Sequence, residues 1–155
     1  MNIKMKMAGL KALEGSLRDL QKEYGGKAAL QAMRPAMKAA IDPLKAPIQS
    51  NTPVDSGGLK ESVKVKIGKP SNKMVKTEHY NKNTVIYGQV GWFWSKPSLW
   101  FQAVSVEYGN VNIPAHRPLS NALESGASRA LQRFKDKLGP SIEKKAKSLA
   151  KKRAK

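Results

Sequence analysis

The chain contains no cysteine and only two histidines, and both shortages exclude classes of chemistry. Without cysteine there is no disulfide bond and no thiolate metal site, which agrees with assembly in a reducing cytoplasm. His79 and His116 stand far apart and lack the spacing of a metal-binding pair. No phosphate-binding loop, zinc-protease helix motif or nucleophile elbow occurs. The sequence therefore predicts no enzyme, no metal site and no cofactor.

Acidic residues are also scarce, because eleven Asp and Glu face 29 Lys and Arg, for a net charge of +18. No two carboxylates are adjacent in the sequence, so the paired acids of a metal-dependent nuclease are missing. The excess charge predicts attraction to a polyanion, which can be nucleic acid, acidic lipid or an acidic protein. Most of it comes from lysine, whose hydrated point charge suits non-specific attraction.

Long apolar runs are missing as well. The N-terminus has no uninterrupted apolar stretch of signal-peptide length, and nowhere do about 18 apolar residues follow one another. We therefore expect no membrane-spanning segment and no membrane partner.

Apolar residues at spacings of three and four predict the helices. A first helix covers the leucines and tyrosine between residues 10 and 24 and is broken by Gly25-Gly26. A second pattern, from residue 30 to 48, contains Pro35, Pro43 and Pro47, so we expect a bent or segmented helix. A short helix is expected around 99–107. A long one starts at Pro118, carries Leu119, Leu123, Ala127, Leu131, Phe134 and Leu138 on one face, and ends at Gly139-Pro140.

Two segments show the alternation of strands. Residues 61–69 alternate valine or isoleucine with lysine, and residues 84–92 are rich in β-branched and aromatic residues. They are expected to pair as a small antiparallel sheet, with the polar residues 71–83 as a hairpin loop. The predicted fold class is α+β: N-terminal helices, a small antiparallel sheet, a long C-terminal helix and a basic C-terminal tail. We expect one domain over residues 1–139 and a basic helical or flexible tail over 140–155.

A cluster of aromatic residues follows the second strand and has two interpretations. It comprises Trp92, Phe93, Trp94, Trp100 and Phe101. These side chains could form core beneath a loop. Alternatively, they could anchor a neighbouring subunit, because Trp and Phe are favoured at the centres of interfaces.

Three short stretches indicate places where the backbone changes direction. In the first, residues 52–63, Pro53 biases Thr52 away from the helical region, Asp55 and Ser56 can bond nearby N–H groups, and glycine supplies positive φ. The second is Val-Glu-Tyr-Gly at 106–109, and the third is Ala-His-Arg-Pro-Leu at 115–119, which continues into Ala122-Leu123.

In this order the three stretches resemble the tail-completion proteins of long-tailed bacteriophages, the head–tail joining or neck components. Residues 53–63 match that family's Pro-Val-Asp-Thr/Ser-Gly-x-Leu-x-x-Ser-Val/Ile pattern in full. The second stretch is similar to Val-Glu-Phe/Tyr-Gly-Thr with Asn110 in place of threonine. The third departs from Pro-Phe-Leu-x-Pro-Ala-Leu at Pro118 and Asn121. The motif residues are Pro53, Val54, Asp55, Ser56, Gly57, Leu59, Ser62, Glu107, Tyr108, Gly109, Leu119 and Ala122.

The second stretch also supports a physical interpretation. It predicts a short helix that ends at Gly109, with Tyr108 packed inward. Glu107 is expected to accept hydrogen bonds from loop N–H groups, with those near Ser56 as candidates. Asp55 and Glu107 are assigned structural roles.

The resemblance implies a structural subunit of the virion neck, a homo-oligomer that is commonly a hexameric ring. Its implied partners are the head-closure or connector protein, the tail terminator or tail tube protein, and genomic double-stranded DNA that passes through the lumen. The residues proposed to face either the lumen or acidic partners are Lys64, Lys66, Lys73, Lys76, Lys144, Lys145, Lys151, Lys152 and Arg153. Two alternatives stay open: a tail terminator or other minor tail ring component, and a free-standing basic nucleic-acid-binding protein.

Overall fold

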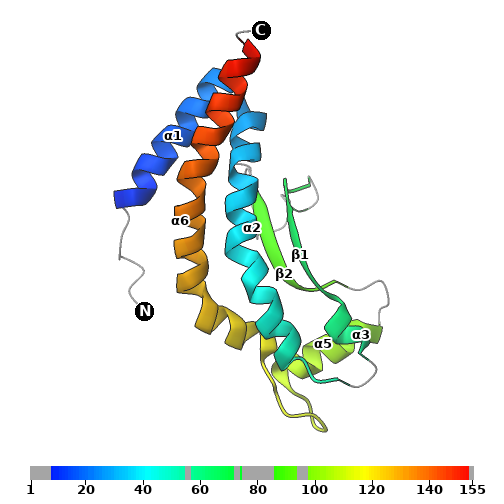
Figure 1. The fold of residues 1–155 in the computed structure, drawn as a ribbon. Coiled ribbons are helices and arrows are strands. Elements are labelled where there is room, and N and C mark those ends of the chain that lie inside the picture. Colours follow the sequence, from blue (N-terminus) through cyan, green and yellow to red (C-terminus); the bar gives the residue numbers. More distant parts are fainter. Residues whose placement is uncertain (1–7, 55–56, 72–73, 75–85, 94–97, 154–155) are drawn as a thin grey trace. The chain divides into compact units, whose positions relative to one another are not determined.

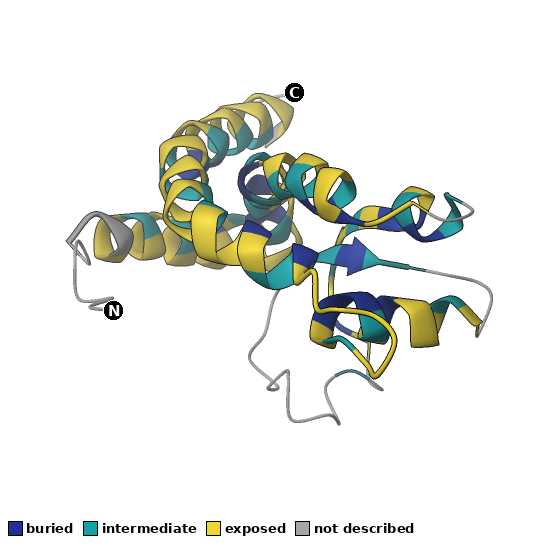
Figure 2. Ribbon diagram, turned by 90° about the horizontal axis from the view of Figure 1, so that it is seen from below, coloured by how far each residue is buried: buried dark blue, intermediate teal, exposed yellow. Residues whose placement is uncertain are grey.

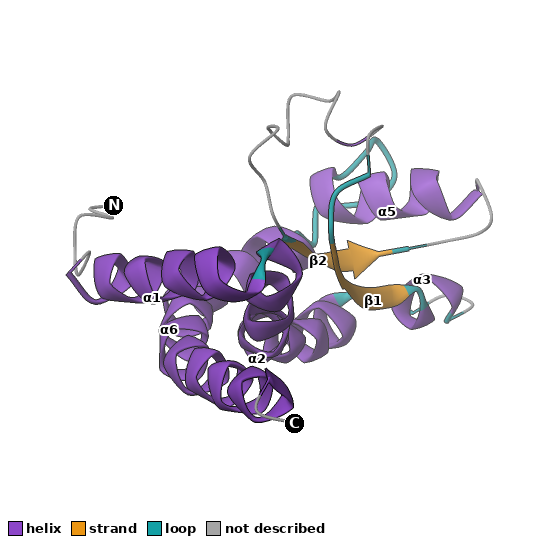
Figure 3. Cartoon of the chain, turned by 90° about the horizontal axis from the view of Figure 1, so that it is seen from above, coloured by secondary structure: helices purple, strands orange, loops and turns teal. Residues whose placement is uncertain are grey.

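The computed structural model describes residues 8–54, 57–71, 74, 86–93 and 98–153, with only the backbone given for 8–10 and 153. These residues form two compact units, each built from separate parts of the chain. Among the described residues, unit 1 contains 8–39, 67–71, 74, 86–87 and 132–153. Unit 2 contains residues 40–66 and 88–131. The order of the elements is shown in Figures 1 and 3.

The two N-terminal helices are α1 (Ala8–Tyr24) and α2 (Gly26–Asn51). Gly25 separates them with a φ of 81°, a left-handed conformation that favours glycine. This break is where the sequence predicted it. Of the two expected forms of the second helix, the segmented one is wrong, because α2 continues through Pro35, Pro43 and Pro47.

The sheet consists of β1 (Val63–Gly68) and β2 (Tyr87–Trp92), two antiparallel strands. The pairing continues past the strands, where the Phe93 N–H donates to the Ser62 carbonyl at 2.8 Å. Val63 is fully buried and Lys64 and Lys66 are exposed, so β1 has the predicted apolar and basic faces. Most of the predicted hairpin loop lies outside the described residues.

The remaining helices are α3 (Gly58–Glu61), α5 (Ser98–Tyr108) and α6 (Pro118–Arg153). α5 matches the short helix predicted around 99–107. The predicted helix end at Gly139-Pro140 is wrong, since α6 continues through both residues to Arg153. Pro140 is exposed. Proline has no N–H group, so the helix lacks one backbone hydrogen bond there, but the ring lies outside the buried core.

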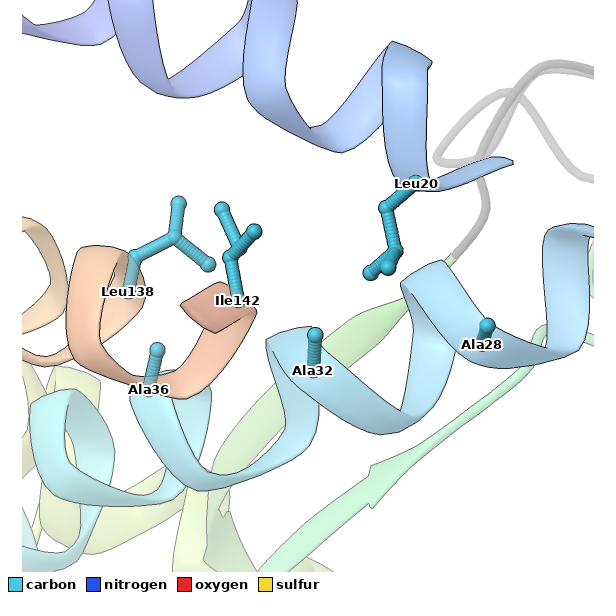
Figure 4. Close-up of a cluster of buried hydrophobic side chains, with 6 residues drawn as sticks. All are labelled: Leu20, Ala28, Ala32, Ala36, Leu138 and Ile142. Carbon is cyan, nitrogen blue, oxygen red and sulfur yellow. The ribbon is translucent and has the colours of Figure 1, made fainter. Parts of the chain in front are cut away.

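The core of unit 1 lies between α1, α2 and the C-terminal half of α6 (Figure 4). Small alanines of α2, among them Ala32 and Ala36, face larger side chains from the two other helices. Ile142 is buried and Ala146 and Leu149 pack against the same cluster. Residues beyond 139 thus contribute to this core, and this burial favours the helical state of a segment that the sequence predicted to be either helical or flexible.

Unit 2 has two smaller clusters. Ile48 of α2, Val63 of β1 and Ala122 of α6 form the first, and the second joins Leu59 of α3 to α5. The predicted apolar stripe of α6 is only partly buried. Its central leucines, Leu123 and Leu131, are 59% and 45% exposed, and much of α6 is exposed (Figure 2).

The predicted class is confirmed: N-terminal helices, a two-stranded antiparallel sheet and a long C-terminal helix make an α+β fold. In the part of the chain that the structure describes, no helix combines the length and apolar character needed to cross a membrane.

Candidate functional site

The first motif stretch forms the corner between α2 and β1. Gly57 has a φ of 80° and is the N-cap residue of α3, so the chain turns there in a conformation that other residues rarely adopt. The hydroxyl of the buried Thr52 donates to the Ile48 carbonyl at 2.6 Å, and Ser62 closes α3 with a bond to the Leu59 carbonyl at 2.7 Å. Asp55 and Ser56 lie outside the described residues.

Glu107 connects the second and third stretches. Its carboxylate is 4% exposed and accepts hydrogen bonds from the N–H groups of Leu119 and Ser120 at 2.9 and 3.0 Å. The Ser120 hydroxyl donates to it as well. These donors belong to the first turn of α6, where N–H groups have no partner within the helix and the helix dipole favours a negative charge. Glu107 is an acceptor as predicted, but the donors that the structure shows come from α6.

Tyr108 has the opposite orientation from the one predicted. It is 78% exposed, and the inward packing expected from the sequence is wrong. The inward positions at the end of α5 are taken by Val106 and Glu107, which are 8% and 4% exposed. Because successive helix residues are turned by about 100°, Tyr108 is left facing outward.

The end of α5 is held by a tight loop. Gly109 has a φ of 79°, and a Cβ there would lie 3.0 Å from the Ala115 nitrogen. Asn110, which replaces the family's threonine, donates to the Ser105 hydroxyl and accepts the Ile113 N–H, each at 2.9 Å. The Asn110 side chain therefore closes the turn that follows α5.

The first two stretches meet at a surface hollow of about 330 Å³ in unit 2. The corner supplies Pro53, Val54 and Gly57, and α5 supplies Phe101 and Val106. The lining is mostly apolar, and Val54 and Phe101 are 65% and 67% exposed. The sequence suggested that these two stretches lie close together, but it did not predict an apolar hollow between them.

The residues of the aromatic cluster differ in their burial. Trp92 packs against both clusters of unit 2, and its buried Nε1–H has no hydrogen-bond acceptor among the described residues. Phe93 is half-buried, with the Lys66 Nζ 3.9 Å from its ring centroid. Trp100 and Phe101 are exposed and meet edge to face at 4.9 Å. Trp94 lies outside the described residues.

The predicted lysines belong to two different groups. Lys64 and Lys66 project from β1, whereas Lys73 and Lys76 fall outside the described residues. The C-terminal set lies on α6, where Lys144 and Lys145 border a hollow of about 360 Å³ beside Gln31 of α2. Lys151 and Lys152 line a second hollow of about 750 Å³ on α6, together with Lys144. The side chain of Arg153 is not described.

The α6 lysines include a regular row. Lys137, Lys144 and Lys151 are seven residues apart, so they lie on one side of the helix about 10 Å from one another. Within the described ranges no cluster of His, Asp and Glu suits a metal ion. The described residues thus form two surfaces. In unit 1, Lys137, Lys144 and Lys151 form the basic ridge of α6, and in unit 2 the corner and α5 form an apolar hollow. Val104 of α5 and Val111 of the loop after it are exposed as well, which the sequence did not indicate because exposure depends on the elements that pack against a segment.

The third stretch begins α6 as predicted. Pro118 is buried at the first helical position, Leu119 packs against the core and Ala122 is 2% exposed. Asn121, which stands in place of the family's proline, donates from its side chain to the His116 carbonyl at 3.1 Å.

Comparison with known proteins agrees with these motifs. Residues 14–109 match a family described as "Bacteriophage HK97-gp10, putative tail-component". The match includes the first two stretches and ends before the third. Neither the curated proteins nor the solved structures gave a match. Because the family match covers more than half of the chain, the protein belongs to the HK97-gp10-like family of bacteriophage tail components.

Proposed function

We propose that the chain is a neck protein, a tail-completion or head–tail joining subunit of the virion. In this proposal, copies form a ring, commonly a hexamer, between the head connector or head-closure protein and the tail terminator or tail tube. Genomic double-stranded DNA passes through the lumen. The observation that carries the proposal is the family match over residues 14–109, which contains the corner and the Glu-Tyr-Gly stretch. No turnover and no cofactor is required.

The basic ridge of α6 supports a role beside polyanions. Lys137, Lys144 and Lys151 form a row of positive charge on a chain with a net charge of +18. Duplex DNA carries about one negative charge per 1.7 Å of axis, so such a row is attracted to it. Tight phosphate binding would hinder DNA exit, and we therefore assign most of these lysines to acidic surfaces of neighbouring rings.

The test is loss of the chain from the phage that encodes it. If the neck is its place, particles made without it should accumulate as DNA-filled heads and separate tails of normal length, visible by electron microscopy. Tails of uncontrolled length would instead support the tail-terminator alternative, because a ring that stops tube growth would be missing. Normal joined virions would contradict both assignments.

A free-standing nucleic-acid-binding protein is the second candidate, favoured by the lysine row of α6. It predicts tight binding of duplex or single-stranded DNA by the isolated chain, with a steep loss of affinity as salt rises. Replacing Lys144 and Lys151 with Gln should then lower the slope of log K against log salt by about 0.9 for each phosphate that the variant no longer neutralises. A neck subunit should bind weakly as a monomer, and its affinity should change little in that variant.

A further inference from the structure

Two exposed rows of apolar side chains lie on unit 2. On α5, Trp100, Val104 and Tyr108 are 49%, 37% and 78% exposed. On α6, Leu123 and Leu131 are 59% and 45% exposed, with the exposed Ala127 between them. In both rows the members are four residues apart. Each row is therefore a ridge of the kind that packs into the grooves of another helix.

Both rows lie beside the inward faces of their helices. On α6, Ala122 is buried, and a Cβ built at Gly126 would overlap the Leu44 Cδ2, so this face lies close against α2. Leu123 and Ala127 follow one residue later and are turned by about 100° from it. On α5 the inward face is held by Ala103, which is 3% exposed. The inward faces are occupied within the chain, and the two rows remain exposed.

The two rows are nearly free of the charge that dominates the rest of the chain. Residues 98–115 contain no lysine or arginine, whereas the whole chain has 29 in 155 residues. Their one acidic residue, Glu107, is buried and bonded to the start of α6. Residues 118–131 carry one acid and one base, Glu124 and Arg129, and Glu124 pairs with Arg117 at 3.4 Å. Both surfaces are therefore close to neutral.

We propose that the α5 row of one copy packs against the α6 row of a second copy. Two chains that each carry +18 repel one another, and close approach is least costly where no lysine loses its hydration. Ridges formed by residues four apart interdigitate with helices crossing near −50°. Ala127 is small and lies between Leu123 and Leu131, so the α6 row of one copy has room for the Val104 side chain of the other.

In this proposal each copy uses its α5 row toward one neighbour and its α6 row toward another, so the contact is heterologous. Repetition of a heterologous contact produces a closed ring or an open filament, whereas an isologous contact stops at a dimer. This inference rests on the proposed ring function and names the surfaces that would build the ring.

Two single variants and their mixture test the pairing. Val104→Asp places a charge in the α5 row, and Ala127→Asp places one in the α6 row. Each should weaken self-association at least roughly tenfold, because a carboxylate would be buried without a partner. When the two are mixed, the intact α5 row of one meets the intact α6 row of the other. Sedimentation velocity should then show a dimer that grows no further. This dimer would also prove that both variants are folded.

Ala12→Asp is the matched control, since Ala12 is an exposed alanine of α1 outside both rows. It should assemble like the unmodified chain. Raising salt from about 0.1 to about 0.5 M should strengthen assembly of the unmodified chain, because screening reduces like-charge repulsion while apolar packing persists. A partner held by the basic ridge would show the opposite salt dependence.

Three results would overturn the inference. One is an unmodified chain that stays monomeric at both salt concentrations. Another is normal assembly by both variants. The third is a mixture that stays monomeric, since an isologous contact would not be rescued by mixing. None of these results bears on the neck assignment itself. That assignment is tested separately, by electron microscopy of the particles made without the chain.

Discussion

At the scale of single residues, Glu107 has the most specific role in unit 2. A buried carboxylate is costly unless it is hydrogen-bonded, and here it accepts two backbone N–H groups and the Ser120 hydroxyl. It thereby joins the end of α5 to the first turn of α6. The helix terminus in turn gains the acceptor and the negative charge that it favours.

Glu107→Gln should therefore destabilise the protein by about 1.5–3 kcal/mol, the range for hydrogen bonds to charged groups. The amide removes the negative charge and turns an NH₂ group toward donors. Chemical denaturation measures the loss. Glu124→Gln is the control, because this exposed partner of Arg117 should contribute at most about 1 kcal/mol. Equal effects for the two variants would contradict the capping role.

Gly57 is the second residue with a defined conformational role. A Cβ there would meet no atom within 4 Å, so the constraint comes from its φ of 80° alone. Gly57→Val should cost more than the roughly 1–2 kcal/mol typical of an L-residue in this region, since valine is β-branched. Gly57→Asn should cost less, because asparagine tolerates the left-handed conformation. Thermal unfolding compares them. A valine variant as stable as the asparagine variant would contradict the assignment, and normal incorporation of the valine variant into particles would argue against a need for the corner.

At the scale of elements, the long helices tolerate residues that usually end helices. α2 contains three prolines and α6 contains Pro140. Each proline removes one backbone hydrogen bond. Burial of Ile48 near the end of α2, and of Ile142 just after Pro140, stabilises the helical segments beyond these positions. Tertiary packing therefore outweighs the local cost in both helices.

Pro140→Ala should stabilise the protein by about 1–3 kcal/mol, because alanine restores an N–H donor and suits a helix interior. Pro140 is exposed, so the substitution leaves the packing of the core unchanged. Pro114→Ala is the control: it lies in the exposed loop before α6 and should change stability by less than about 1 kcal/mol. A destabilised Pro140→Ala variant would show that the proline has a role beyond being tolerated.

Packing between α2 and α6 in unit 2 depends on Gly126. A Cβ there would displace the terminal methyl of the half-buried Leu44, so Gly126→Val should cost about 1 kcal/mol, the low end of the range for overpacking. Gly15→Val supplies the comparison, because Gly15 of α1 has no neighbour within 4 Å and changes only helix propensity. Urea denaturation measures both variants. If their effects on stability are equal, the close approach at Gly126 is not limiting.

At the scale of the whole molecule, the C-terminal segment contributes to the core as well as to the charge. The sequence divides the chain into a domain over 1–139 and a tail over 140–155, and this division remains a prediction about independent folding. The burial of Ile142 and the packing of Leu149 show which apolar side chains the shorter chain would be without.

A chain that ends at residue 139 should be less stable than the full chain by at least about 1.5–3 kcal/mol, the contribution of one buried isoleucine. A chain that ends at residue 152 retains the cluster and is the control. Denaturation followed by circular dichroism separates the two outcomes. If residues 1–139 are as stable as the full chain, the tail is dispensable for folding and the predicted division is correct.

The sequence by itself determined most of what depends on neighbouring residues. Periodicity located α1, α2, α5, the first part of α6 and both strands but not the short α3. The break at Gly25 followed from glycine's conformational freedom, and Pro118 indicated the start of α6. The motif stretches indicated the family. These features could be predicted because a helical or strand pattern and a turn residue act over a few positions.

The tertiary structure decided what depends on distant residues. It determined that α6 continues through Pro140, that Glu107 bonds to the start of α6, that Tyr108 faces outward, and that the middle of the α6 stripe is exposed. A local pattern shows which residues share a helix face, but the burial of that face depends on the elements that pack against it. Only the folded chain brings those elements together.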